Sequence, residues 1–251
     1  MVDRERQPLL VQIHIPKTAG SALRRVLNKE YGGRFRKTPN TFTHPQVAEE
    51  RLRARVTGEN AVQPLAVAGH IVFGLRDELP ADSRYLTVLR EPVERTLSHY
   101  GYLVAPRDPK ERPHGLLARD TPYRPELSLE EALEDPRYLP GNLQTRMIVC
   151  RRSPFEQLPG NALEQAKEHL RSRFAFVGVT ERFDEFAGLL ASAFGWAPRV
   201  PPRKRVGDLR PERASLSREA LRALEKHDAF DLELYALASE LQEQAVVGGR
   251  G

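Results

Sequence analysis

Four short apolar runs limit the folds available to this chain more than any other feature of its sequence. They are Leu9–Ile15, Leu65–Ala68, Tyr85–Leu89 and Phe174–Val179. Leucine and valine recur at helical spacing after the first run, and Pro92 stands where a helix would begin after the third. Strands that alternate with helices are typical of a parallel sheet with helical crossovers. We therefore expect an α/β fold of three layers, with a central, mostly parallel sheet flanked by helices.

The chain has 251 residues and neither internal repeats nor a domain-scale linker. We expect a single domain over residues 1–245, followed by a flexible tail at 246–251. Five prolines and little periodicity between Val104 and Leu127 predict a surface insertion. Helices are expected over Ser21–Lys29, from Pro92 to about Leu103, from a capping box at Ser128 and Glu131 to near Tyr138, from Asn161 through Leu170, after a cap at Thr180, and over Ser217 to about Gln244.

Composition narrows the function further. Hydrophobic residues make up 40% and charged residues 29%, as in a soluble globular protein, and no apolar run approaches the ~18 residues of a membrane span. The charged first eight residues lack the apolar core of a signal peptide, and the single cysteine, Cys150, cannot form an internal disulfide. We expect a cytoplasmic protein.

The net charge is +5, and 32 of the 39 basic residues are arginines, because only seven are lysines. Arginine suits phosphate, sulfate and carboxylate groups, although genomic base composition would also raise its content. Acidic residues are interspersed with the basic ones, so nucleic acid is not the expected partner.

The segment from His14 to Ala22 joins the first apolar run to a helix. Backbone N–H groups of such a loop, together with the helix N-terminus, point at one spot and bind a phosphate. Lys17 adds a positive charge, and Thr18 and Ser21 add hydroxyl groups. The loop lacks the G-x-x-x-x-G-K-[ST] pattern of a Mg²⁺-nucleotide ATPase. A plain turn with an exposed lysine is the alternative reading.

The third apolar run ends at Arg90, and Ser98 lies on the helix that follows. Because the carboxyl ends of parallel strands share one edge, Arg90 and Lys17 are expected on the same side of the sheet. An arginine and a serine there could hold a second phosphate. Alternatively, Arg90 could simply pair with Glu91 or Glu94.

Together, IPKTAGSAL and YLTVLREPVERTLSHY resemble the sulfotransferases that use 3′-phosphoadenosine 5′-phosphosulfate (PAPS). The resemblance is greatest to the carbohydrate branch, which includes heparan sulfate 2-O-sulfotransferase and bacterial relatives. GHIVFG from Gly69, GNLQTR from Gly141 and FVGVTE from Phe176 extend it along most of the chain. It implies a P-loop-like fold, PAPS as sulfuryl donor and 3′-phosphoadenosine 5′-phosphate (PAP) as product.

The resemblance also implies roles for particular residues. It places the 5′-phosphosulfate on the first loop, at Lys17, Thr18, Ala19, Gly20, Ser21 and Ala22, and the 3′-phosphate on Arg90 and Ser98. A closing loop at Arg203, Lys204 and Arg205 is expected over the 3′-phosphate. Lys17 would stabilise the leaving phosphate oxygen, and His70 would act as general base. The sequence supports His70 independently, because it follows a buried strand at the same edge and an imidazole titrates near ~6.5.

Position alone suggests acceptor contacts for Arg76, His99, Gln144 and Arg146. The remaining histidines are expected to pack, as for His14, or to be solvated, as for His44, His114, His169 and His227. No cluster suggests a metal, and the chemistry needs none.

Relatives from eukaryotes usually carry a membrane anchor and disulfides, so the sequence favours a bacterial enzyme. The expected acceptor is a hydroxyl of a carbohydrate or another hydroxylated compound, with an acidic saccharide as one option. A Mg²⁺-dependent P-loop small-molecule kinase, or a non-catalytic relative that binds a nucleotide or a polyanion, remain alternatives. The sequence leaves the oligomeric state open.

Overall fold

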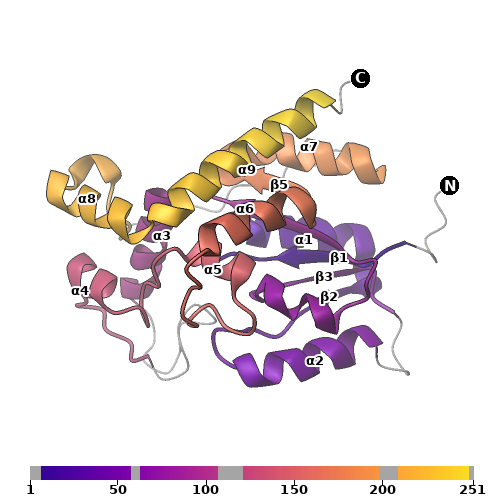
Figure 1. The fold of residues 1–251 in the computed structure, drawn as a ribbon, viewed down its shortest axis with the longest axis horizontal. Helices are drawn as coiled ribbons and strands as arrows, with labels where there is room; N and C mark the ends of the chain where they lie inside the picture. The colour runs from indigo at the N-terminus through magenta and orange to yellow at the C-terminus, as the bar shows by residue number, and fades with distance from the viewer. Residues whose placement is uncertain (1–6, 58–62, 107–120, 198–208, 249–251) are drawn as a thin grey trace.

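The computed structural model describes residues 7–57, 63–106, 121–197 and 209–248. Its centre is a sheet of five parallel strands in the order β2-β3-β1-β4-β5. The strands are β1 (Leu10–Ile13), β2 (Phe35–Lys37), β3 (Ala66–Gly69), β4 (Arg84–Leu89) and β5 (Phe174–Val179). Because β1 lies in the middle, with β3 and β4 beside it, the segments that follow these three strands meet at one edge (Figure 1).

Helices connect the strands and cover the sheet. The α-helices are α1 (Gly20–Tyr31), α2 (Pro45–Thr57), α3 (Pro92–Val104), α4 (Leu129–Glu134), α5 (Leu143–Val149), α6 (Ala162–Ser172), α7 (Phe183–Phe194), α8 (Arg218–His227) and α9 (Ala229–Gly248). Short 3₁₀ turns are η2 (Gly32–Arg34), η3 (Phe73–Glu78), η4 (Thr180–Arg182) and η5 (Arg213–Ser215).

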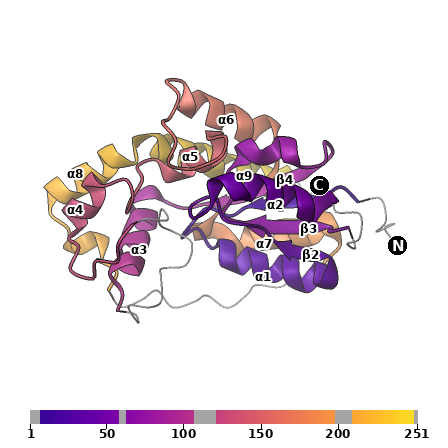
Figure 2. The same ribbon diagram turned by 90° about the horizontal axis from the view of Figure 1, so that it is seen from below.

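Apolar side chains pack on both faces of the sheet. On one face, Val11 and Ile13 join a core that contains residues of α2, α5, α6 and α9. On the other, Leu10 packs in a core with residues of α1 and α7. Figure 2 shows α1 and α7 on one side of the strands and α5 and α6 on the other. The expected three-layer α/β fold is confirmed, and every described strand pairing is parallel.

A third apolar cluster lies away from the sheet, where α3, α4 and α8 pack together. Leu97 of α3 and Leu224 of α8 are fully buried in it. Leu127 also belongs to it, and Tyr100 donates a hydrogen bond to the Leu127 carbonyl (2.8 Å). The described end of the predicted 104–127 insertion is therefore packed against α3.

Several boundaries differ from the expectations. The capping box of Ser128 and Glu131 is present, but its helix ends at Glu134 rather than near Tyr138. Asn161 precedes α6 without a side-chain cap, and Thr180 does not cap α7, because its hydroxyl donates to the Leu89 carbonyl (2.9 Å). The last amphipathic region forms two helices, and α9 continues to Gly248, into the segment expected to be a tail.

Candidate active site at the carboxyl edge of the sheet

The loop between β1 and α1 has a strained backbone. Lys17 has φ +69° and Ala19 has φ +58°, and Thr18 between them is not in the positive-φ region. A left-handed conformation costs a residue with a Cβ about 1–2 kcal/mol, so this loop keeps its shape against a local preference. Alternation of left-handed and right-handed residues is how backbone N–H groups form a concave anion site. Strain of this kind collects at functional sites.

Buried groups beneath the loop hold that shape. Gln12 donates to the Gly20 carbonyl (3.0 Å), and the buried Thr18 hydroxyl donates to the Ile15 carbonyl (2.9 Å). The His14 ring fills the space over Gly20, so a Cβ there would lie 1.9 Å from His14 Cδ2. Because the Thr18 hydroxyl already donates its hydrogen to the Ile15 carbonyl, we expect Thr18 to bind an anion through its backbone N–H instead. Ser21, in the first turn of α1, is exposed.

Lys17 connects the loop to α3. Its Nζ lies 4.9 Å from the centre of the Tyr102 ring, a cation–π contact. Tyr102 is one helical turn after Ser98, so the two residues share a face of α3. Arg90 Nη1 donates to the Lys17 carbonyl (3.2 Å). The structure therefore brings Lys17 and Arg90 into contact, with Ser98 on the adjoining face of α3.

Arg90 and Arg210 lie close to the same carboxylate. One carboxylate, that of Glu94, lies 3.8 Å from Arg90 Nη2 and also pairs with Arg210. Burial, and then the charge of Arg210, lower the pKa of Arg90, although an arginine remains protonated at neutral pH. Among the described residues, nothing hydrogen-bonds to Arg90 Nε or Arg210 Nε. Two guanidinium groups that share one carboxylate can accept an anion.

His70 lies against the base of the same loop. Its ring stacks on His14 at 4.2 Å, and its Nδ1 is 2.7 Å from the His14 carbonyl oxygen. A carbonyl only accepts, so Nδ1 carries the hydrogen and Nε2 keeps its lone pair. Burial lowers the pKa of His70 to about 4, against the opposing effect of this hydrogen bond. His70 is therefore neutral at pH 7.

The four residues suggested as acceptor contacts differ in burial and in their contacts within the protein. His99 and Gln144 are fully buried, and both polar groups of the Gln144 amide bind the backbone of Arg90. Arg146 donates to the carbonyls of Gly141 (2.7 Å) and Glu156 (2.5 Å). Gln144 and Arg146 thus bond within the protein, and acceptor contacts for these residues stay a prediction. Arg76 is partly exposed, 5.3 Å from the centre of the Phe73 ring and 3.7 Å from Asp77.

The expectations for the remaining histidines are confirmed for two residues and wrong for two others. His14 packs as expected and His44 is exposed, but His169 and His227 are not solvated. His169 bonds to the Ile148 carbonyl, and His227 bonds to the Leu139 carbonyl. His114 and the basic residues Arg203, Lys204 and Arg205 lie outside the described residues.

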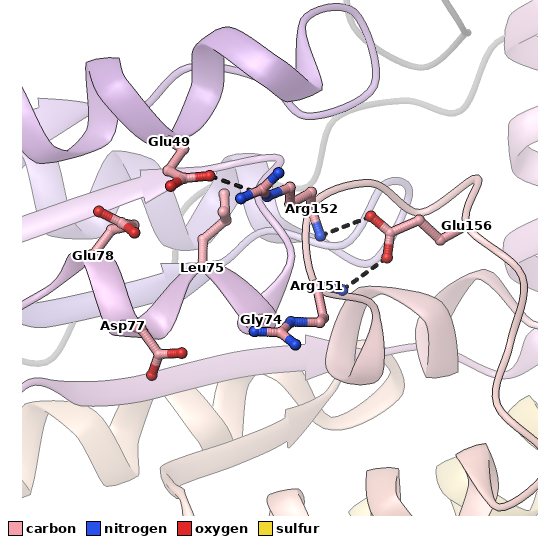
Figure 3. Close-up of a pocket in the computed structure, with 8 residues that line it drawn as sticks. All are labelled: Glu49, Gly74, Leu75, Asp77, Glu78, Arg151, Arg152 and Glu156. Carbon is pink, nitrogen blue, oxygen red and sulfur yellow. Dashed lines mark hydrogen bonds and ion pairs between the residues drawn. The ribbon is translucent and has the colours of Figure 1, made fainter.

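A cavity of about 500 Å³ lies elsewhere (Figure 3). It is lined by Glu49 of α2, residues of η3 and the segment after α5, namely Gly74, Leu75, Asp77, Glu78, Arg151, Arg152 and Glu156. Its four carboxylates outnumber its two guanidinium groups, and Glu156 is occupied by the backbone N–H groups of Arg151 and Arg152. No predicted site residue lines it, and its charge is unsuited to a nucleotide phosphate.

Within the described parts of the chain, no group of three or more His, Cys, Asp or Glu residues could hold a metal ion. The helices described there include none long and apolar enough to span a membrane.

Comparisons with known proteins add to this geometry. No family model matches the chain. A curated protein, heparan-sulfate 6-O-sulfotransferase 2 of Gallus gallus, is 28% identical over 178 residues, which are 62% of this chain and 43% of that protein. The chain thus spans less than half the length of this relative. A solved structure of a sulfotransferase from Alicyclobacillus acidocaldarius has a TM-score of 0.49 and 19% identity, over 98% of this chain and 99% of that one.

The class of protein to which this chain is similar is therefore the sulfotransferases, as its motifs predict. The motifs and the curated relative point to two different sulfotransferases. The motifs resemble those of a heparan sulfate 2-O-sulfotransferase, whereas the curated relative is a 6-O-sulfotransferase.

Proposed function

We propose that this protein transfers a sulfuryl group from PAPS to a hydroxyl group of a carbohydrate or another hydroxylated acceptor. The observation that carries the proposal is the meeting of the strained β1–α1 loop, Arg90 and neutral His70 at one edge of the sheet. The sequence similarity to a curated sulfotransferase supports it. The name of that relative includes heparan sulfate, which favours a saccharide acceptor.

The residues present fit the donor. Backbone N–H groups of residues 17–22 would hold the 5′-phosphosulfate, with the Lys17 ammonium beside them. Arg90 and Ser98 would hold the 3′-phosphate. The Nε atoms of Arg90 and Arg210, which are buried with no hydrogen-bond partner among the described residues, support an anion there. Arg203, Lys204 and Arg205 would close over the same phosphate. PAPS, when bound, supplies the sulfuryl group.

His70 would act as general base, because its Nε2 lone pair is free to take the proton of an acceptor hydroxyl. Lys17 would stabilise the charge that develops on the leaving phosphate oxygen. In this proposal the positive charge that stabilises the donor phosphates and the leaving oxygen comes from the lysine and arginine side chains named above. We propose that the protein acts in the cytoplasm of a bacterium, as expected from its sequence.

The experiment that tests the activity is transfer of labelled sulfate from PAPS to a panel of neutral and acidic saccharides, in the presence of EDTA. We expect labelled saccharide together with an equal amount of PAP. Phosphate transfer from Mg²⁺-ATP would instead support the kinase alternative. Binding of PAP without transfer to any hydroxyl group would support the non-catalytic alternative.

A further inference from the structure

Arg90 is held by an amide clamp. Its N–H donates to Gln144 Oε1 (2.9 Å), and its carbonyl accepts from Gln144 Nε2 (2.9 Å). Arg90 directly follows β4, whose last paired residue is Leu89. The fully buried Gln144 side chain therefore replaces a neighbouring strand for one residue. A clamp on both polar groups of a residue fixes the direction in which its side chain leaves the backbone.

Gln144 is fixed in turn by Asp231. The Asp231 carboxylate accepts from the Gln144 N–H (2.9 Å), from the Thr145 N–H (2.7 Å) and from the Thr145 hydroxyl (2.8 Å). Asp231 is fully buried in the first turn of α9, and the groups it binds are in the first turn of α5. The carboxylate therefore supplies the acceptor that the start of a helix lacks.

The starts of α5 and α9 also cap each other. Asn142, at φ +53°, accepts the Phe230 N–H (2.7 Å), while Asp228 accepts the Asn142 N–H (3.1 Å). Asp228 is further bound by Thr96 and lies 3.9 Å from the buried guanidinium of Arg95. Thr96 and Arg95 belong to α3, the helix that also carries Ser98. This buried polar network therefore joins the segment around Arg90 to α5, α9 and α3.

We propose that Gln144, held by Asp231, is a positioning residue that aims Arg90 at the 3′-phosphate of the donor. This inference rests on the proposed function, because it takes the ligand of Arg90 from it. The clamp uses an amide, which offers an acceptor and a donor side by side on one planar group and carries no charge. A carboxylate would turn an oxygen toward the Arg90 carbonyl, and leucine would leave both backbone groups unbonded.

Gln242 is a matched control. It is also a fully buried glutamine that clamps backbone at a strand end, because it accepts the Val179 N–H (2.7 Å) and donates to the Arg182 carbonyl (2.9 Å). Neither bond involves Arg90. Gln242→Glu and Gln144→Glu therefore disturb the same chemistry at two places, only one of which supports the proposed phosphate site.

The test is calorimetric binding of two nucleotides to the wild-type protein and both variants. PAP carries the 3′-phosphate, and adenosine 5′-phosphosulfate lacks it. We expect Gln144→Glu to weaken PAP about tenfold, as for the loss of about 1.4 kcal/mol of binding, and to change the affinity for adenosine 5′-phosphosulfate less than twofold. Gln242→Glu should leave both affinities unchanged. Gln144→Asn, which keeps the amide but shortens the side chain, replaces Gln144→Glu if the latter does not fold.

Equal PAP affinity in wild type and the Gln144 variant would overturn the inference. Equal losses for both nucleotides would also overturn it, because they indicate a general disturbance of the fold. If the wild-type protein binds neither nucleotide, the proposed function itself fails, and this inference fails with it.

Discussion

At the scale of single residues, the protonation state of His70 decides whether the proposed reaction can proceed. Its Nδ1–H is committed to the His14 carbonyl, so only Nε2 is available for proton transfer. A pKa near 4 leaves almost all of the protein with a neutral ring at pH 7. Such a base is unprotonated at pH 7 but weakly basic. A bound anionic donor would raise its pKa toward neutral pH, where a general base is most effective.

Replacing His70 by alanine should separate chemistry from binding. We expect His70→Ala to lower the rate of sulfuryl transfer by about 10²–10⁴-fold, the contribution of a general base, while the Kd for PAP stays within about threefold. His169→Ala is the control, because His169 is also a partly buried histidine bonded to a backbone carbonyl, on α6. A His70→Ala protein as active as the His169→Ala protein would remove His70 from the base role.

The low pKa of His70 also predicts how stability depends on pH. The unfolded chain takes up a proton near ~6.5 and the folded protein only near 4, so acidification between these values favours unfolding. We expect the free energy of unfolding of wild type to fall more steeply between pH 6.5 and 4.5 than that of His70→Gln. Urea unfolding at several pH values measures this difference.

The comparison with a variant matters because other buried groups titrate in the same window. Burial lowers the pKa of His14, whereas burial and the charge of Asp228 raise the pKa of Asp231 to about 6, which acts in the opposite sense. His44→Gln, at an exposed position, is the control. Parallel pH profiles for wild type and His70→Gln would contradict the assigned pKa.

The sequence indicates which residues follow the strands but not which of them are buried. Lys17, His70 and Arg90 could be placed at one edge because each comes within two residues of the end of an apolar run. The sequence suggests Gln144 and His99 as acceptor contacts from their position alone. Their burial depends on the packing of α5 and α3 against other helices, which local sequence does not encode.

At the scale of elements, the β1–α1 loop depends on close packing at its base. Gly20→Ala would force a Cβ into the His14 ring, which in turn stacks on His70. We expect this variant to lose about 1–3 kcal/mol of unfolding free energy and to bind PAP at least tenfold more weakly. Urea unfolding and calorimetry check the two effects.

Gly188 in α7 offers the matched control, because no atom lies within 4 Å of the Cβ that alanine would add. Gly188→Ala should leave PAP binding unchanged and raise the unfolding free energy by up to about 1 kcal/mol, as alanine is the better helix former. Gly20→Ala with wild-type stability and affinity would contradict the packing of His14 on the loop.

The elements themselves were predictable where apolar runs are continuous. The strands β1, β3, β4 and β5 lie where such runs predict them. The missed β2 is three residues long at the edge of the sheet, and two of its residues are charged. In α2, Ala48, Leu52 and Val56 form a single buried stripe at four-residue spacing among charged residues. That spacing was the available signal for α2.

At the scale of the whole molecule, both faces of the sheet are covered by helices, whereas its carboxyl edge carries the candidate site residues. Helices cover both faces with apolar cores, and α3, α4 and α8 form a further cluster joined to the sheet by β4 (Figure 1). The α3 helix belongs to that cluster and also carries Ser98 and Tyr102. Under the proposed function, a donor would lie between the sheet and α3, with His70 on the β3 side.

The most direct test of this account is thermal unfolding with PAP, compared with ATP, each with EDTA and with Mg²⁺. A ligand at 100 times its Kd adds about 2.7 kcal/mol of stability, which raises the Tm by roughly 5–10 °C for a domain of this size. We predict this shift for PAP without metal, and a much smaller one for the Lys17→Ala protein. A shift that appears only with Mg²⁺-ATP, or an equal PAP shift for Lys17→Ala, would contradict the proposed donor site.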